Sequence, residues 1–191
     1  MSNILNVLKA TGAIMEGHFQ LTSGRHSNVY LEKFRLLERP HVVDEIGLMM
    51  ARAFPDREIG VVLGAAVGGI LLSHATARAL DTRSIFAERV DGRLALRRGF
   101  QLAPGDNVLV VEDIVTTGGS VKELLDIVRK HQARTVGVAC LVDRSEGGMD
   151  LGCPVETLAR FPARSWDSGS CPLCRKDVPL ESRGRTGKNS E

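Results

Sequence analysis

The stretch from Val108 to Ser120, V-L-V-V-E-D-I-V-T-T-G-G-S, most constrains how this chain can fold. Its first four residues are apolar and predict a buried strand of the kind found in parallel sheets. Two adjacent carboxylates, Glu112 and Asp113, follow, and small polar residues and glycines come next. Apolar residues then recur at helical spacing, at Val121, Leu124, Leu125 and Val128. The stretch therefore predicts a strand, an acidic pair, a small-residue loop and a helix.

This order of elements suits an anionic ligand. Ligands of open α/β sheets bind beyond the carboxyl ends of the strands, where a helix N-terminus offers unpaired N–H groups and a positive dipole end. Gly118 and Gly119 let the backbone approach a phosphate closely, and Thr116, Thr117 and Ser120 add hydroxyl donors. The acidic pair cannot bind the phosphate, but it suits the hydroxyls of an attached sugar or a divalent metal. The predicted ligand is a sugar phosphate.

A purely structural interpretation of the same stretch also exists. Ser120 and Glu123 have the spacing of a capping box, and glycines between a strand and a helix are ordinary turn residues. We favour the phosphate site because the carboxylates, threonines and glycines all occur together.

Composition narrows the class of protein. The chain has 191 residues, of which 43% are hydrophobic, which suits one domain with a sizeable core. A formal net charge of only +2 argues against a nucleic-acid partner. The longest apolar run, Val61 to Leu72, is broken by glycines and too short to span a membrane, and no signal peptide is visible. Four cysteines do not suggest a disulfide framework, so we expect a cytoplasmic enzyme without a membrane partner.

Residues 110–120, V-V-E-D-I-V-T-T-G-G-S, resemble the phosphoribosyl pyrophosphate (PRPP) signature of type I phosphoribosyltransferases. Over nearly its whole length the chain resembles the orotate branch of that family. The supporting stretches are G-H-F-Q-L-T-S-G-R-H-S at 17–27, Asp143 with Arg144, and C-P-L-C-R at 171–175. The resemblance implies that residues 112–120 bind PRPP, namely Glu112, Asp113, Ile114, Val115, Thr116, Thr117, Gly118, Gly119 and Ser120.

Alternating strand and helix signals predict an α/β fold with a mainly parallel sheet flanked by helices. The resemblance implies a single type I phosphoribosyltransferase domain over 1–181, with a small N-terminal hood from about 1–37 plus late segments. A polar tail at 182–191 is expected to be disordered. The predicted elements are a helix from Ile4 to near Gly12, strands at 29–34, 59–63, 84–87, 135–142 and 155–159, and helices after Pro40, near Ile70 and after Ser120.

A second strand–glycine–helix unit contains G-A-A-V-G-G at 64–69. The glycine pattern is weak by itself. Beside the first unit it suits the pyrophosphate half of PRPP, and the resemblance implies that role for Ala65, Ala66, Val67, Gly68 and Gly69. His74 lies within an apolar helical pattern, and we interpret it as structural.

Asp91-Gly92 predicts a hairpin among basic residues, within E-R-V-D-G-R-L-A-L-R-R-G at 88–99. The hairpin could be merely a solvated surface. Alternatively its arginines could close over pyrophosphate, because guanidinium groups bind phosphate bidentately. The resemblance implies a lid that reaches a neighbouring subunit's site in a homodimer, with Arg89 at a family lysine position and Arg93 as a further PRPP ligand. The lid is short and has no lysine or histidine.

The orotate-binding residues come from the resemblance. It implies that Arg144 pairs with the carboxylate of orotate, with Thr116 nearby, whereas the structural alternative for Arg144 is a surface ion pair with Asp143 or Glu146. Thr22 stands where the family usually has a lysine, and Arg25 is the candidate substitute.

Cys171 and Cys174 have zinc-knuckle spacing but supply only two of four ligands. The others would have to come from Cys153, a histidine or a second chain, so we expect a reduced turn rather than a metal site. The only expected cofactor is Mg²⁺, which the resemblance implies is held through PRPP.

The resemblance implies the transfer of ribose 5-phosphate from PRPP to orotate, as in pyrimidine biosynthesis. Glu112, Asp113 and Arg89 are the catalytic candidates. The alternatives are a phosphoribosyltransferase for a purine or another base, and a regulator that binds PRPP without chemistry.

Overall fold

The computed structural model describes residues 4–21, 23–145, 147–161 and 164–183. The chain divides into two compact units. The larger one spans Leu36–Phe161, and the smaller one combines Met1–Arg35 with Pro162–Glu191. The smaller unit thus contains the segments that were expected to form the hood.

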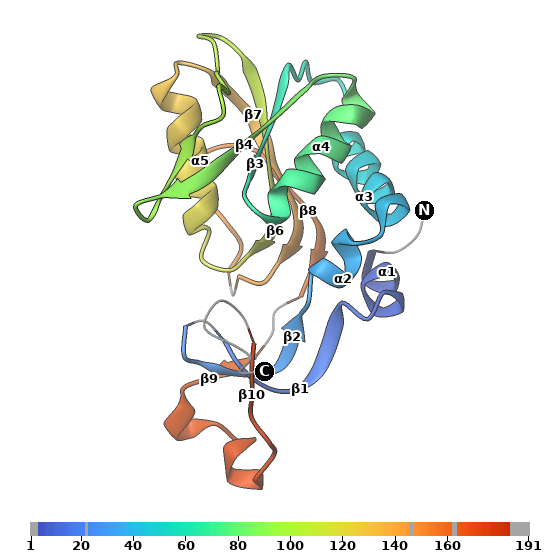
Figure 1. Cartoon of the computed structure of the whole chain (residues 1–191), viewed down its shortest axis with the longest axis vertical. Helices are drawn as coiled ribbons and strands as arrows, with labels where there is room; N and C mark the ends of the chain where they lie inside the picture. The colour runs from blue at the N-terminus through green and yellow to red at the C-terminus, as the bar shows by residue number, and fades with distance from the viewer. Residues whose placement is uncertain (1–3, 22, 146, 162–163, 184–191) are drawn as a thin grey trace. The chain divides into compact units, whose positions relative to one another are not determined.

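The larger unit is built on a six-stranded sheet with the order β5-β4-β3-β6-β7-β8 (Figure 1). All neighbouring strands pair in parallel except β5, which is antiparallel to β4. The strand bounds are β3 Val61–Ala65, β4 Arg83–Val90, β5 Arg93–Leu96, β6 Asn107–Val115, β7 Arg134–Asp143 and β8 Val155–Arg160. The predicted mainly parallel α/β fold is confirmed.

Helices cover both faces of this sheet, with α3 and α4 on one face and α5 on the other (Figure 1). Side chains alternate along a strand, so Val61, Leu63, Val108 and Val110 all face α5 and form one core with it. The helix bounds are α2 Phe34–Leu37, α3 Pro40–Arg52, α4 Gly68–Leu80 and α5 Gly119–Lys130. Pro40 occupies the first helical position of α3, where its missing N–H has no intrahelical partner to lose.

One detail of these helices differs from the expectation. His74 lies on the exposed face of α4, so its interpretation as a structural core residue is wrong. The buried face of α4 contains Leu72, Ala75 and Thr76. The small side chain of Ala75 lets α3 pack closely against this face. On α3 the apolar residues Val42, Val43, Ile46 and Met50 are buried, whereas Met49 is only half-buried.

The smaller unit contains a four-stranded sheet with the order β10-β1-β2-β9. Strands β1 and β2 form an antiparallel pair whose register shifts between Glu16 and Phe19. Strand β10 joins β1 in parallel, and β9 joins β2 in antiparallel orientation. The bounds are α1 Ile4–Ala10, β1 Ile14–Gln20, β2 His26–Leu31, β9 Ser165–Trp166, β10 Glu181–Ser182, and the 3₁₀ turns η1 Ser168–Ser170 and η2 Cys174–Lys176.

The ends of the predicted elements shift in this unit. The strand expected at 29–34 stops at Leu31, because α2 begins at Phe34. Ser182, assigned to the tail, pairs with Gln20 in the sheet, and Arg183 forms an ion pair with Glu181. The rest of the expected tail, together with Thr22 and Glu146, lies outside the described residues.

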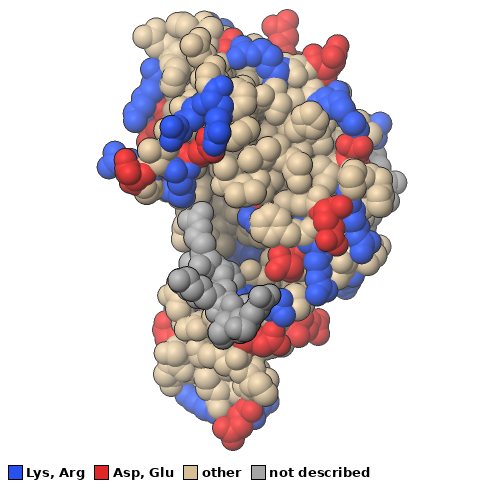
Figure 2. All heavy atoms as spheres, viewed as in Figure 1, with Lys and Arg blue, Asp and Glu red and all other residues tan. Residues whose placement is uncertain are grey.

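The surface carries charges of both signs. Figure 2 shows Lys and Arg interspersed with Asp and Glu over the face drawn there. This mixture matches the small formal net charge of +2. Among the described residues, no helix has the length and apolarity needed to cross a membrane.

Candidate active site

The loop between β6 and α5 forms the start of the candidate site. Strand β6 ends at Val115 and α5 begins at Gly119. Gly118 occupies the N-cap position with a φ of 75°, a left-handed conformation that glycine adopts without strain. No side chain of the described residues caps this helix. The first-turn N–H groups of α5 are therefore available to an anion.

A cavity of about 220 Å³ lies at this loop. It is at the carboxyl end of β6, where ligands of open parallel sheets bind. Most of the residues predicted to bind PRPP therefore line one cavity. Its lining residues are Arg89, Glu112, Ile114, Val115, Thr116, Thr117, Gly118, Gly119, Ser120, Val121 and Glu123.

The two carboxylates of the acidic pair lie in the last part of β6 and are buried. Glu112 is 6% exposed and Asp113 is 4% exposed. Successive residues of a strand point to opposite faces, and of the two only Glu112 is among the described residues that line the cavity. The Asp113 Oδ1 accepts a hydrogen bond of 2.6 Å from the Ile114 N–H. The pair therefore presents one carboxylate directly to a ligand in this cavity.

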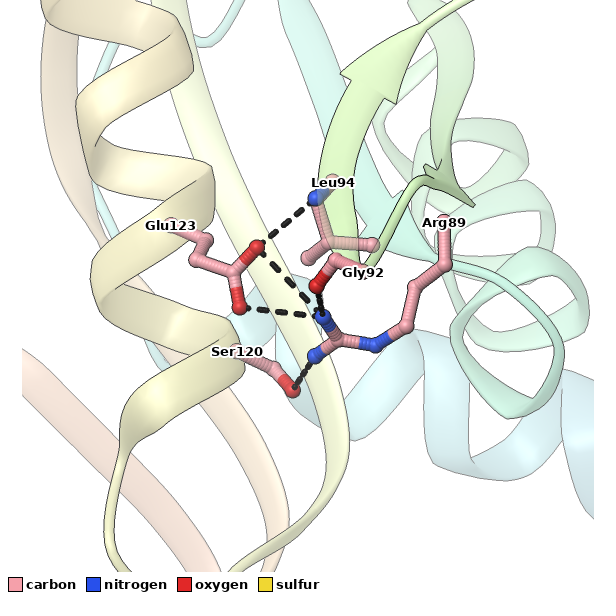
Figure 3. A network of polar contacts seen from close by, with 5 residues as sticks. All are labelled: Arg89, Gly92, Leu94, Ser120 and Glu123. Atoms are coloured by element: carbon pink, nitrogen blue, oxygen red, sulfur yellow. Dashed lines mark hydrogen bonds and ion pairs between the residues drawn. The ribbon is translucent and has the colours of Figure 1, made fainter.

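Arg89 lines the cavity, and its guanidinium lies beside the first turn of α5 (Figure 3). It comes from β4, and its guanidinium forms an ion pair with Glu123 at 3.1 Å and donates to Ser120 Oγ at 3.3 Å. It also donates to the Gly92 carbonyl at 2.7 Å. Arg89 thus places a cation beside the glycine-capped helix end.

Glu123 does not close the capping box that its sequence position suggested. Its carboxylate accepts the Leu94 N–H at 2.7 Å and pairs with Arg89, so it joins the hairpin to α5. Glu123 and Val121 also line the cavity, although the sequence pattern did not indicate it. The spacing to Ser120 fitted a cap, and the contact with Arg89 spans 34 residues of chain.

The β4–β5 hairpin has the predicted two-residue turn, and Val90 pairs with Arg93 across Asp91-Gly92. Arg93 is exposed and is not among the described residues that line the cavity. Arg98 forms two hydrogen bonds with the Glu88 carboxylate, at 2.9 and 3.0 Å. These bonds lower the pKa of Glu88 and raise that of Arg98.

The predicted pyrophosphate loop, Ala65–Gly69, joins β3 to α4. Gly64 pairs with Val111 of β6, so this loop and the β6–α5 loop leave the same edge of the sheet on neighbouring strands. A Cβ built on Gly64 would lie 2.3 Å from the Gly69 carbonyl oxygen, so the backbone folds tightly there. The Ala66 N–H donates to the Ala87 carbonyl at 2.8 Å.

Arg144 follows β7 at that same edge. Its N–H donates to the Val115 carbonyl at 2.8 Å, which holds its backbone beside the β6–α5 loop. Asp143, one partner considered for Arg144, accepts hydrogen bonds from the Ser145 N–H and hydroxyl at 2.8 and 2.6 Å. The Asp143 carboxylate also lies 3.7 Å from Arg160.

Comparisons with known proteins decide the family. The family model for the phosphoribosyl transferase domain matches residues 35–160. The orotate phosphoribosyltransferase of Caldicellulosiruptor bescii is 45% identical over 184 residues, which cover 96% of this chain and 97% of that protein. The chain belongs to the orotate phosphoribosyltransferase family.

Further relatives agree. The orotate phosphoribosyltransferase of Thermotoga maritima is 45% identical over 96% of this chain and 98% of its own. The crystal structure of orotate phosphoribosyltransferase from Aeropyrum pernix matches 83% of this chain and 93% of its own with a TM-score of 0.68 and 27% identity. This family member is therefore a pentosyltransferase enzyme with the type I phosphoribosyltransferase fold.

Arg25, the candidate orotate ligand near the family lysine position, belongs to the smaller unit. It forms an ion pair with Asp167 at 2.7 Å and donates to Ser165 Oγ at 3.0 Å and to the Ser165 carbonyl at 2.8 Å. In this orotate phosphoribosyltransferase family member, these three contacts join Arg25, just before β2, to β9 and to Asp167, which follows it.

Proposed function

We propose that this protein transfers ribose 5-phosphate from PRPP to orotate, giving orotidine 5′-monophosphate and pyrophosphate. The observation that carries the proposal is the cavity at the β6–α5 loop. There the first-turn N–H groups of α5 lie next to Thr116, Thr117 and Ser120 and to the buried Glu112 carboxylate. Such a site suits a phosphate on one side and sugar hydroxyls on the other. The 45% identity to orotate phosphoribosyltransferases supports orotate as the base.

Different residues would have different roles in the proposed reaction. Glycosyl transfer builds positive charge at the anomeric carbon and negative charge on the departing pyrophosphate. The β6–α5 loop would hold the 5′-phosphate, while Glu112 and Asp113 would orient the ribose and stabilise the developing cation. The pyrophosphate would lie at Ala65–Gly69, since that loop leaves the sheet beside β6. Orotate is already anionic, so a strong general base is not required.

We propose Mg²⁺ as the cofactor. Magnesium usually binds through one or two carboxylates together with substrate phosphates, so it would arrive on PRPP and neutralise charge on the pyrophosphate. Glu112 lines the cavity among the described residues, so its carboxylate would be the one that faces the metal–PRPP complex.

The assembly and location are proposals as well. A homodimer in which each hairpin completes the partner's site would give the exposed Arg93 a role in binding PRPP. None of the four cysteines forms a disulfide, which suits the reducing conditions of the cytoplasm.

The decisive experiment is product formation from PRPP and Mg²⁺ with orotate, uracil, adenine, guanine and hypoxanthine. We expect turnover of orotate alone. Turnover of a purine instead would contradict the proposed base, and PRPP binding without any turnover would favour the regulatory alternative.

Asp113→Asn should lower kcat strongly, and near-normal turnover of this variant would remove Asp113 from the site.

A further inference from the structure

Four side chains with metal-binding atoms meet inside the smaller unit. His18 and His26 come from β1 and β2, and Cys171 and Cys174 come from the segment that joins β9 to β10. One ligand atom from each residue lies within 4.8 Å of every other. His18, His26 and Cys171 are at most 4% exposed, whereas Cys174 is exposed. We propose that these four residues bind a zinc ion.

The distances between the ligand atoms suit a tetrahedral site. The His18 Nε2 lies 2.9 Å from the His26 Nδ1, and it lies 3.4 and 3.8 Å from the sulfurs of Cys171 and Cys174. The Cys174 sulfur lies 3.3 Å from the His26 Nδ1. Zinc bonds of about 2.0–2.1 Å to nitrogen and about 2.3 Å to sulfur give tetrahedral edges of roughly 3.3–3.8 Å. These four distances thus lie within about half an ångström of the tetrahedral edges, and the remaining two pairs of ligand atoms lie within 4.8 Å.

A hydrogen bond outside the cluster fixes the His18 ring. Its Nδ1 lies 2.8 Å from the Val178 carbonyl oxygen. A carbonyl oxygen only accepts, so Nδ1 carries the proton and Nε2 presents its lone pair to the cluster. Zinc-binding histidines are typically oriented by such a bond from the other ring nitrogen. A cation would satisfy this lone pair together with the His26 nitrogen and both sulfurs.

The ligand types indicate zinc and a structural role. Two thiolates and two imidazoles form a common structural zinc set, whereas Mg²⁺ and Ca²⁺ prefer oxygen. Four protein ligands leave no open position for a substrate, so the ion would stabilise the fold rather than catalyse. The sequence favoured a reduced turn at Cys171 and Cys174 because two ligands were missing, and the structure supplies them from β1 and β2.

The ion would link parts of the smaller unit that are far apart in the sequence. Cys171 is 153 residues from His18 in the sequence. The two-residue strands β9 and β10 add few backbone hydrogen bonds. Small units of this kind commonly gain stability from a bound metal, because the binding free energy contributes to folding.

Metal analysis of the full chain, purified without a polyhistidine tag or chelators, tests the proposal. We expect about one zinc per chain, in line with a single four-ligand site. Cys171→Ser and His18→Asn should lose most of it. The matched controls Cys153→Ser and His74→Asn should retain it, since neither residue belongs to the cluster. A metal-free wild-type chain that takes up no added Zn²⁺ would overturn the proposal.

Cobalt substitution keeps the test valid if a variant fails to fold. Wild-type protein loaded with Co²⁺ should show thiolate-to-cobalt charge transfer and the strong visible bands of a tetrahedral site. Weak octahedral bands without charge transfer would contradict the Cys₂His₂ assignment. A Cys171–Cys174 disulfide in the protein as purified, before any metal removal, would also contradict it and would point to a redox pair. Neither measurement depends on whether orotate is the substrate.

Discussion

The Glu123 carboxylate accepts hydrogen bonds from two different donors, the backbone N–H of Leu94 and the Arg89 guanidinium. Both side chains of the ion pair are 33% exposed, so solvent weakens it, and such pairs contribute about 0.2–1 kcal/mol. Removing the acceptor of the half-buried Leu94 N–H costs more free energy than losing the ion pair, because the donor is left without a hydrogen bond. Glu123 should therefore stabilise the hairpin chiefly as a hydrogen-bond acceptor.

A pair of substitutions separates these contributions. Glu123→Gln keeps an acceptor oxygen for Leu94 and should lower the free energy of unfolding by less than about 1 kcal/mol. Glu123→Ala removes the acceptor and should cost about 1–3 kcal/mol. Urea denaturation followed by circular dichroism measures both values. Equal losses in the two variants would show that the ion pair, rather than the hydrogen bond, stabilises the hairpin.

Arg144 is the residue on which the proposed choice of base depends. Its backbone is fixed beside the β6–α5 loop, and a guanidinium there can bind a carboxylate bidentately. Arg144→Ala should raise KM for orotate by about 10–100-fold, because hydrogen bonds to charged groups contribute about 1.5–3 kcal/mol. KM for PRPP should change much less. Steady-state kinetics with each substrate varied in turn supplies the measurement.

Arg144→Lys is the matched control for that experiment. Lysine keeps the charge but lacks the planar fork, so it should restore only part of the affinity for orotate. Equal increases of KM for orotate and PRPP in Arg144→Ala would argue against a pairing with the orotate carboxylate.

Between elements, the contact of α3 with α4 depends on the absence of one side chain. A Cβ on Gly47 would lie 2.5 Å from the Ala75 carbonyl carbon, which is backbone and cannot rotate away. Gly47→Ala should therefore lower the free energy of unfolding by about 1–3 kcal/mol, since the helices would have to separate. Helix propensity alone predicts the opposite change in stability, because it favours alanine over glycine by about 1 kcal/mol.

Leu48→Ala is the control for this position. Leu48 is the next residue of the same helix and is 39% exposed, so its truncation should change stability little. Thermal denaturation of the three proteins gives the comparison. A Gly47→Ala variant as stable as the wild type would mean that α3 and α4 can move apart at no cost.

The elements of the larger unit were largely predictable because their strands are continuous apolar runs and their helices have regular stripes. The β6–α5 loop was predictable because the site residues are contiguous in sequence. Strand β1 was missed, since Glu16 and Gly17 interrupt its alternation and its register shifts there. The position of His74 was mispredicted because α4 buries Leu72 together with small residues such as Ala75 and Thr76, and His74 lies outside that face.

The side-chain contacts that join remote segments could not be predicted in the same way. Sequence spacing alone does not bring His18 and His26 to the cysteines more than 140 residues later, because β9 and β10 first have to pair with β2 and β1. The C-P-L-C spacing together with two histidines in a short segment was the available signal. From that signal, a histidine was only one of three possible sources of the missing ligands, beside Cys153 and a second chain.

For the whole molecule, the two units should respond differently to metal removal. Chelation of the proposed zinc should destabilise the smaller unit while the sheet of the larger unit keeps its core. Hydrogen exchange measured by mass spectrometry should then speed up in β1, β2, β9 and β10. Peptides from β3, β6 and β7 should stay protected. Uniform acceleration in both units, or none in either, would contradict this division of stability.

The smaller unit combines both ends of the chain, and this sets an order for its biosynthesis. The larger unit is complete once residue 161 has emerged, whereas β1 and β2 must wait for β9 and β10. At roughly 5–20 residues per second, the first hairpin remains without these partners for about 7–30 seconds on the ribosome. During that interval His18 and His26 are accessible to solvent, chaperones or other metal ions, because Cys171 and Cys174 have not yet been synthesised. Folding in the cell would then end with this closure, after the sheet that carries the β6–α5 loop has already formed.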